Sequence, residues 1–287
     1  QLMIGMHNYH DAHLAFPIGG FSSADRMHEI TWARSILPFI EQGAFYDGIP
    51  YKSAVAWYST NDAYFCKKYV STFSCPSDEK MWYNNNTEGY SKHNYIVCVG
   101  PTGASSYFDS SNYWPAGIAA KTTSGTRTTN WNGGGMFRMG FKGIGSIPFL
   151  CRTMSDILDG TSNTMAMSEL ILVNKDLGPA STSIRDLRGM LWYVWGVYYC
   201  AFYGPNTSEK DYPGATSTLF VNASFAPAVP GQQMTNDPSL VISARSRHSG
   251  GVNVAMADGS VRFVSNTVDL DIWQAASTTK GSETKSF

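Results

Sequence analysis

The sequence contains few charged residues and no long apolar run. Only 15% of its 287 residues are charged, against roughly 25% in an average soluble domain. The net charge is −1, and nucleic-acid-binding proteins usually carry a basic surface, so we expect no nucleic-acid partner. No stretch approaches the roughly 18–20 consecutive apolar residues that a membrane-spanning helix needs.

The familiar signatures of metal sites and catalytic sites are also missing. The five cysteines contain no C-x2-C pair, which argues against zinc-ribbon and thioredoxin-like proteins. They allow at most two disulfides, and spacing does not fix how they pair. Neither G-x-S-x-G nor G-x-x-x-x-G-K-[ST] occurs. Because no acid, base and nucleophile converge in the sequence, we expect that the protein is not an enzyme.

The residues that are plentiful predict a β-rich protein with a sizeable core. Apolar residues make up 43% of the chain and aromatic residues 14%. Apolar spacing predicts helices over 1–14, 29–42, about 55–70 and 268–276, and strands over 94–99 and 164–170. The aromatic segment 189–203 is expected to form a buried strand pair. Two long polar stretches, 100–135 and 204–240, predict loops that make contacts with other molecules.

Residues 247–264, RHSGGVNVAMADGSVRFV, form the most informative segment. Val252 and Val254 alternate as in a strand, and Asp258-Gly259 predicts a two-residue type I′ turn. Val261 and Phe263 are expected to continue the apolar face after this turn. His248 and Asp258 would lie at opposite ends of one strand, too far apart to act as a catalytic pair.

Six motifs in order resemble a family of planctomycete-type pseudopilin-like proteins, known as domain of unknown function 1559 or SBP_bac_10. They are IGMHNYHDAHLAFP at 4–17, WARSILPFIEQ at 32–42, FSCPSD at 73–78, Asn94-Tyr95, DGTSNT at 159–164 with Glu169, and the H-x9-DG motif of His248, Asp258 and Gly259. The resemblance covers nearly the whole chain. We expect structural roles for the motif residues Cys75, Pro76, Asp159, Gly160, Ser162, Asn163, Glu169, His248, Asp258 and Gly259.

The resemblance implies a pilin-like α+β fold with a large antiparallel β-rich globular domain. Residues 1–16 would be the C-terminal end of the pilin-type helix, and residues 17–287 the globular domain with long loop insertions. The family also implies a prepilin leader and an apolar helix that hold the precursor in the inner membrane. Neither is found in this sequence, which resembles the family only from the end of that helix onward.

Two groups of residues are candidate metal ligands. Asp156, Asp159, Asn163 and Glu169 supply oxygen atoms around a glycine turn, which suits Ca²⁺. The alternative is a turn in which Asp159 and Asn163 satisfy nearby backbone groups. Histidines at 7, 10 and 13 could also ligate a metal from one helix, or simply form hydrogen bonds at its end.

The function that the resemblance implies is structural. We expect a subunit of an extracellular or cell-surface pilus-like filament, related to type II secretion pseudopilins, whose partners are other copies of itself or other pilin-like subunits. A surface-displayed carbohydrate- or solute-binding module is the alternative, because Trp192, Trp195 and Tyr198 could stack on sugar rings. That alternative requires some of these rings to be exposed in a groove.

Overall fold

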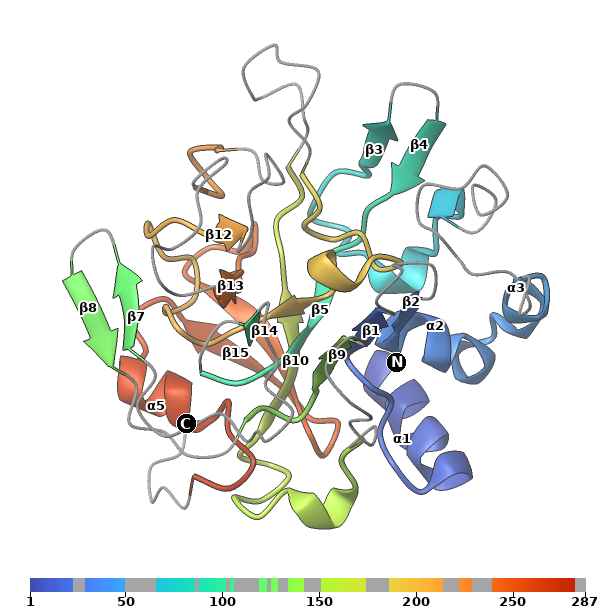
Figure 1. The fold of residues 1–287 in the computed structure, drawn as a ribbon, viewed down its shortest axis with the longest axis horizontal. Helices are drawn as coiled ribbons and strands as arrows, with labels where there is room; N and C mark the ends of the chain where they lie inside the picture. The colour runs from blue at the N-terminus through green and yellow to red at the C-terminus, as the bar shows by residue number, and fades with distance from the viewer. Residues whose placement is uncertain are drawn as a thin grey trace.

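A five-stranded sheet forms the centre of the molecule (Figure 1). The computed structural model describes residues 1–22, 29–49, 66–85, 88–101, 104–105, 119–122, 125–128, 134–141, 151–173, 186–213, 222–228 and 239–281. In spatial order the central strands are β11 (Tyr198–Tyr199), β5 (Tyr95–Cys98), β10 (Met165–Glu169), β14 (Gly251–Met256) and β15 (Val261–Ser265). All neighbours are antiparallel except β11 and β5, which are parallel.

Four smaller sheets surround this centre. One has the order β2 (Glu29–Thr31), β1 (Gly20–Ser22), β9 (Met139–Phe141), in which β1 and β9 are parallel. Another has the order β12 (Tyr212–Pro213), β13 (Ser239–Val241), β6 (Ala104–Ser105). The other two are the hairpins β3 (Trp82–Asn85) with β4 (Glu88–Ser91), and β7 (Ala119–Thr122) with β8 (Gly125–Thr128).

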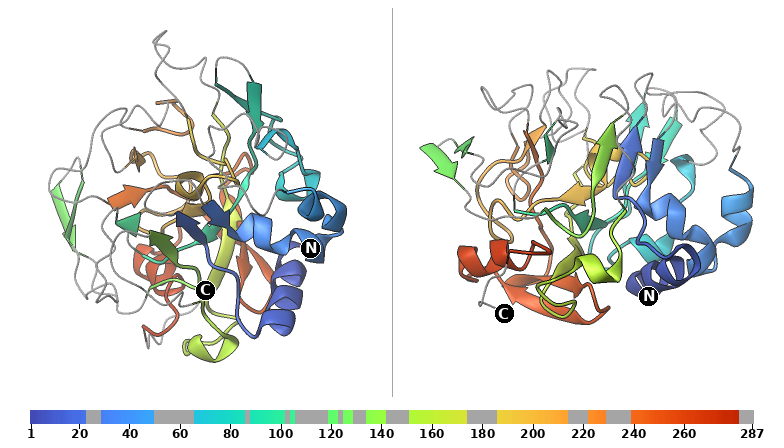
Figure 2. Two further views of the ribbon diagram at one scale, coloured as in Figure 1. Left: turned by 45° about the vertical axis from the view of Figure 1, so that its right-hand side comes forward. Right: turned by 60° about the horizontal axis from the view of Figure 1, so that its bottom comes forward.

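The helices are short and lie beside the central sheet. The α-helices are α1 (Leu2–His13), α2 (Trp32–Ile36), α3 (Gly43–Asp47) and α5 (Leu270–Ala275), and the 3₁₀ turns are η1 (Leu37–Ile40), η2 (Ser71–Phe73), η3 (Met154–Asp156) and η5 (Val194–Gly196). Figures 1 and 2 show α1, α2 and α3 together on one side and α5 apart from them. In the part of the chain that the structure describes, no helix has the length and apolarity to cross a membrane. A short N-terminal helix with mostly antiparallel sheets confirms the α+β class.

The expected helices are only partly found. Helix α1 and helix α5 match the predictions, and Asp269 caps α5 by accepting hydrogen bonds from the backbone of residues 271 and 272. The prediction of a single helix over 29–42 was wrong, because residues 29–31 form strand β2 and pair with β1. Pro38, which has no N–H to donate, lies in the first turn of η1. Most of the helix expected over 55–70 lies outside the described residues.

The two strands expected from apolar runs are confirmed as β5 and β10. Nearly all their side chains are buried, which fits central strands covered on both faces. Segment 189–203 is buried as expected but contributes only the two-residue strand β11 and the turn η5, rather than a strand pair. The long loops expected over 100–135 and 204–240 lie largely outside the described residues.

The C-terminal hairpin forms with a different turn from the one expected. Gly259 has a positive φ of 89°, whereas Asp258 does not have a positive φ. The Gly259 N–H donates to the Met256 carbonyl at 2.9 Å, and the Met256 N–H donates to the Ser260 carbonyl at 2.8 Å. This is a three-residue loop that ends in a left-handed glycine, and the type I′ prediction was wrong.

The additional loop residue reverses which side chains face the core after the turn. Val252 lies opposite Val264, and both are buried. Val261 and Phe263 are instead more than half exposed, so the expectation that they continue the buried face was wrong. The hairpin therefore presents two large apolar side chains on the outer face of β15, an edge strand of the central sheet.

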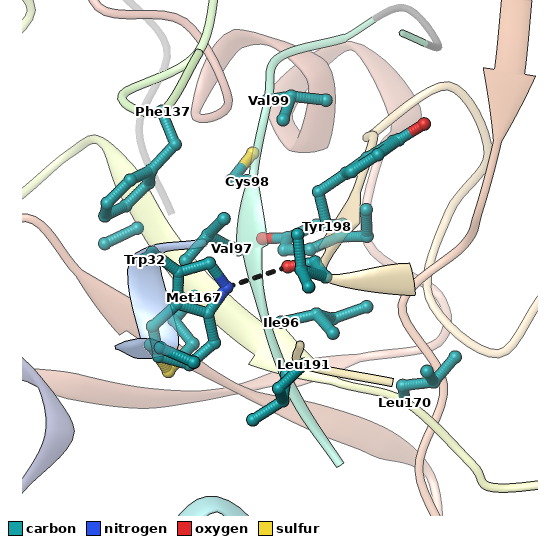
Figure 3. Packing of buried hydrophobic residues seen from close by; sticks show 14 of the residues in the cluster. Trp32, Ile96, Val97, Cys98, Val99, Phe137, Met167, Leu170, Leu191 and Tyr198 are labelled. Carbon is teal, nitrogen blue, oxygen red and sulfur yellow. Dashed lines mark hydrogen bonds between the residues drawn. The ribbon is translucent and has the colours of Figure 1, made fainter. Parts of the chain in front are cut away.

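The core of the molecule joins the N-terminal helices to the central sheet (Figure 3). Trp32 is fully buried, and its indole N–H donates to the Val197 carbonyl at 3.0 Å. Leu2, Met3 and Met6 of α1 belong to the same buried cluster as the strands. All five cysteines are in the reduced form, outside any disulfide, and four of them are buried.

Beside this apolar core lies a buried network of charged side chains. Asp186 pairs with Lys92 at 3.3 Å and with Arg188 at 2.7 Å, and Asp211 pairs with Arg188 at 2.8 Å and with Arg245 at 3.2 Å. All five side chains are 2% exposed or less. Burial lowers the pKa of Lys92, and this effect outweighs the opposite effect of the neighbouring Asp186.

Candidate functional site

Three sequence motifs meet at one end of the central strands. Cys75 follows η2, Glu169 ends β10, and His248 lies in the loop before β14. One ligand-type atom from each side chain lies within 4.8 Å of the other two. Among the described residues, this is the group of three His, Cys, Asp or Glu side chains close enough to hold a metal ion.

The three side chains converge on a single ring nitrogen. Nε2 of His248 is 3.0 Å from Oε1 of Glu169 and 3.7 Å from Sγ of Cys75. Cys75 and Glu169 are buried, whereas the His248 side chain is 30% exposed. The imidazole is therefore the most exposed of the three side chains.

The sheet register holds the Glu169 carboxylate in place. Tyr95 of β5 lies directly opposite Glu169, and Asn253 of β14 lies on the other side. The Asn253 backbone N–H donates to Oε2 of Glu169 at 2.8 Å, and its side-chain amide donates to Oε1 at 3.2 Å. Burial, with the adjacent Cys75 and Glu169, raises the pKa of Tyr95 to about 12, so its hydroxyl stays protonated.

The Cys75 backbone is fixed by a tight turn. The Asp78 N–H donates to the Cys75 carbonyl at 3.2 Å, which closes a turn with Pro76 at its second position, where the fixed φ of proline is favourable. Asn94 accepts a hydrogen bond from the Cys75 N–H at 3.0 Å and donates to Asp78 at 2.7 Å. Arg247 pairs with Asp78 at 3.2 Å, which links this turn to the loop that carries His248.

The oxygen ligands expected for Ca²⁺ have separate partners. Asp156 closes the capping box of η3 with Thr153, which lowers its pKa through the Thr153 backbone hydrogen bond. Asp159 accepts hydrogen bonds from Thr278 at 3.1 Å and from the Gly281 N–H at 2.8 Å. Glu169 belongs to the group with His248, so the structure does not bring these three carboxylates to one site.

The DGTSNT motif forms a turn through its own backbone. Gly160 has a positive φ of 94°, and its carbonyl accepts the Asn163 N–H at 3.0 Å. The Asn163 side chain donates to the Asp159 carbonyl at 3.3 Å, which is the local satisfaction that the sequence left open as an alternative. Ser162 is exposed beside it.

The two ends of the H-x9-DG motif have different neighbours, as the sequence analysis expected. Asp258 accepts hydrogen bonds from the backbone and hydroxyl of Ser260 at 2.9 and 2.7 Å, which supports the hairpin turn. His248 contacts Glu169 and Cys75 instead. Two histidines of α1 also have separate partners: His10 accepts a hydrogen bond from the Met154 N–H at 3.2 Å, and His13 contacts the Tyr9 carbonyl.

The aromatic residues considered for sugar binding are in the core where they are described. Trp192 is 3% exposed and donates to the Ser91 hydroxyl at 3.2 Å. Tyr198 is 1% exposed, and burial raises its pKa well above the ordinary value. The Trp195 side chain lies outside the described residues.

Sequence reasoning named Cys75, Glu169 and His248 separately and did not bring them together. They lie far apart in the chain, so no local spacing connects them. The available signal was that each belongs to a different motif of the same family. Strand pairing between β5, β10 and β14 is what brings these motifs together.

In a comparison with known protein families, residues 1–271 match the family described as protein of unknown function DUF1559, SBP_bac_10. No curated protein and no solved structure is significantly similar to the chain. Because the match spans nearly all of the sequence, it confirms the family that the six motifs indicated. The chain belongs to the DUF1559 family.

Proposed function

We propose that this protein is a structural subunit that packs against other copies of itself, or against similar subunits, in an extracellular or cell-surface filament. The observation that carries the proposal is a set of exposed apolar side chains on or next to elements that neighbour one another. Among the residues that the structure describes, five large apolar side chains are each more than half exposed, namely Ile4, Leu14, Leu158, Val261 and Phe263. Exposed apolar side chains on neighbouring elements favour a protein–protein contact.

The elements that carry these residues are neighbours. His10 of α1 contacts the backbone of Met154 in η3. The Asp258 N–H of the hairpin turn donates to the Thr161 carbonyl at 3.0 Å. A side chain added at Gly259 would come within 3.8 Å of both Met3 and His7 of α1. Figure 2 shows α1, η3 and the hairpin on the same side of the molecule.

Strand β15 adds backbone hydrogen-bonding groups to this surface. It is at the edge of the central sheet as described, so its outer side offers N–H and C=O groups to a strand of another molecule. A net charge of −1 means that copies of the chain repel one another little. We propose a pilin-like arrangement in which this side makes the subunit contact, and a structural rather than catalytic role.

The proposal is tested by measuring self-association of the purified chain with sedimentation velocity over a range of concentrations. We expect association that the double variant Val261→Thr/Phe263→Thr weakens at least tenfold. Ile30→Thr is the matched control, because Ile30 is an exposed strand residue of a different sheet. A chain that remains monomeric throughout, or a double variant that associates as strongly as the parent, would contradict the proposal.

A further inference from the structure

We propose that Cys75, Glu169 and His248 form a binding site for a Zn²⁺ ion. This inference is independent of the filament proposal, because it rests on a different group of residues. It also differs from the Ca²⁺ site considered from the sequence, since two of its three ligands are sulfur and nitrogen.

Two separations of the donor atoms are close to those around a tetrahedral zinc ion, and all three atoms lie within 4.8 Å of one another. Zinc bonds of about 2.3 Å to sulfur and about 2.0–2.1 Å to nitrogen and oxygen place S and N ~3.6 Å apart and N and O ~3.4 Å apart. The observed separations are 3.7 Å between Cys75 and His248 and 3.0 Å between His248 and Glu169. An ion between the three atoms requires the carboxylate oxygen to move by a few tenths of an ångström.

The geometry favours a metal site over a thiol catalytic triad. In a triad the carboxylate holds one ring nitrogen of the histidine while the nucleophile contacts the other. Here both the Glu169 oxygen and the Cys75 sulfur approach the same nitrogen, Nε2 of His248. Three donor atoms grouped within 4.8 Å of one another match the arrangement of metal ligands.

Surrounding hydrogen bonds fix the donors independently of the ion. Oε2 of Glu169 is held by the Asn253 backbone N–H at 2.8 Å, which orients Oε1 toward His248. Asn94 holds the Cys75 backbone at 3.0 Å. The backbone N–H of His248 donates to the Ser246 hydroxyl at 3.1 Å. Such support of the ligands by their neighbours is typical of metal sites.

The donor set selects the ion. Thiolate and imidazole ligands suit Zn²⁺, whereas Ca²⁺ and Mg²⁺ require oxygen ligands. A bound thiolate and carboxylate would balance the charge of a divalent ion. The 30% exposure of the His248 side chain leaves the fourth coordination position facing solvent, where water can bind. The ion would join the turn after η2, the end of β10 and the loop before β14.

The test is titration of the metal-free 287-residue chain with Co²⁺ and then Zn²⁺. We expect one Co²⁺ per chain with a charge-transfer absorption that reports a cobalt–thiolate bond, and its displacement by one Zn²⁺. Cys75→Ser removes the thiolate band, and His248→Gln weakens Zn²⁺ binding at least roughly tenfold. Cys151→Ser is the matched control, because Cys151 is a partly exposed free thiol outside the group.

His248→Gln keeps the result interpretable if Cys75→Ser fails to fold, since the His248 side chain is partly exposed. A circular dichroism spectrum identical to the parent shows that the variant is folded. No saturable Co²⁺ binding, binding without a thiolate band, or a band that persists in Cys75→Ser would overturn the zinc proposal. None of these results bears on self-association through β15.

Discussion

The structure predicts that acid destabilises the protein through one buried histidine, His93. The ring is packed against Tyr69, Phe73 and Trp192, and its Nε2 accepts a hydrogen bond from the Val70 N–H at 3.1 Å. Burial lowers the pKa of His93 from 6.5 to about 3. In the folded chain the imidazole therefore stays neutral over a range in which the unfolded chain takes up a proton.

The sign and size follow from proton linkage. Because the unfolded state binds the proton first, the stability present above pH 6.5 is lost progressively as the pH falls toward 3. Each unit of difference in pKa corresponds to about 1.4 kcal/mol, so His93 alone removes roughly 2–3 kcal/mol between pH 7 and pH 4.5. The full loss near pH 3 is about 5 kcal/mol, which is a large part of the stability of a typical protein.

The assay is urea unfolding at several pH values between 7 and 4.5, for the parent and for His93→Gln. We expect the variant to be less stable than the parent at pH 7, because it loses the ring packing of His93. Glutamine can accept the Val70 N–H but does not titrate, so the variant should lose less stability on acidification. His13→Gln is the matched control, because it makes the same substitution at an exposed histidine. Equal pH dependence in the parent and His93→Gln would refute this reasoning.

Two further predictions concern the buried charges and the hairpin turn. Asp211→Asn removes the negative charge that pairs with the buried Arg188 and Arg245. We expect the free energy of unfolding, measured with urea, to fall by about 3–5 kcal/mol. Asp47→Asn, at an exposed position, should change stability by no more than about 0.5 kcal/mol; equal effects of the two would contradict the role of the network. Gly259→Ala places a side chain at positive φ and should cost about 1–2 kcal/mol by thermal unfolding; no loss would contradict the turn geometry.

The sequence predicted most reliably the strands with continuous apolar runs. Strands β5 and β10 were found because central strands buried on both faces need such runs. Residues 29–31 were placed in a helix, since nothing local reveals that β1 pairs with them. The Thr31 hydroxyl donates to the Leu191 carbonyl at 2.6 Å, a contact between distant parts of the chain.

The hairpin illustrates how one residue of loop length changes a prediction. Asp258-Gly259 correctly indicated a turn, but the dipeptide fits both a two-residue loop and a three-residue loop with glycine last. Since side chains alternate along a strand, this single residue decides whether Val261 and Phe263 face the core or solvent. The apolar surface on β15 was therefore invisible from the sequence.

The candidate metal site was only half visible for a similar reason. The motifs drew attention to Cys75, Glu169 and His248, yet their meeting depends on strand order in the sheet. The oxygen-rich segment 156–169 suggested a local metal site, but each of its three carboxylates has a different partner. Asp156 caps η3, Asp159 accepts a hydrogen bond from Thr278, and Glu169 contacts His248. Close spacing in the sequence was a poor guide to closeness in space.

The measurement that tests the central claim most directly is electron microscopy of surface material from cells that produce the protein, with this chain identified by labelled antibody. The proposed function predicts ordered fibres or tubes that carry the label along their length, and their loss in the Val261→Thr/Phe263→Thr variant. Label found only on dispersed single molecules, with the protein at normal abundance, would contradict a structural role in a filament.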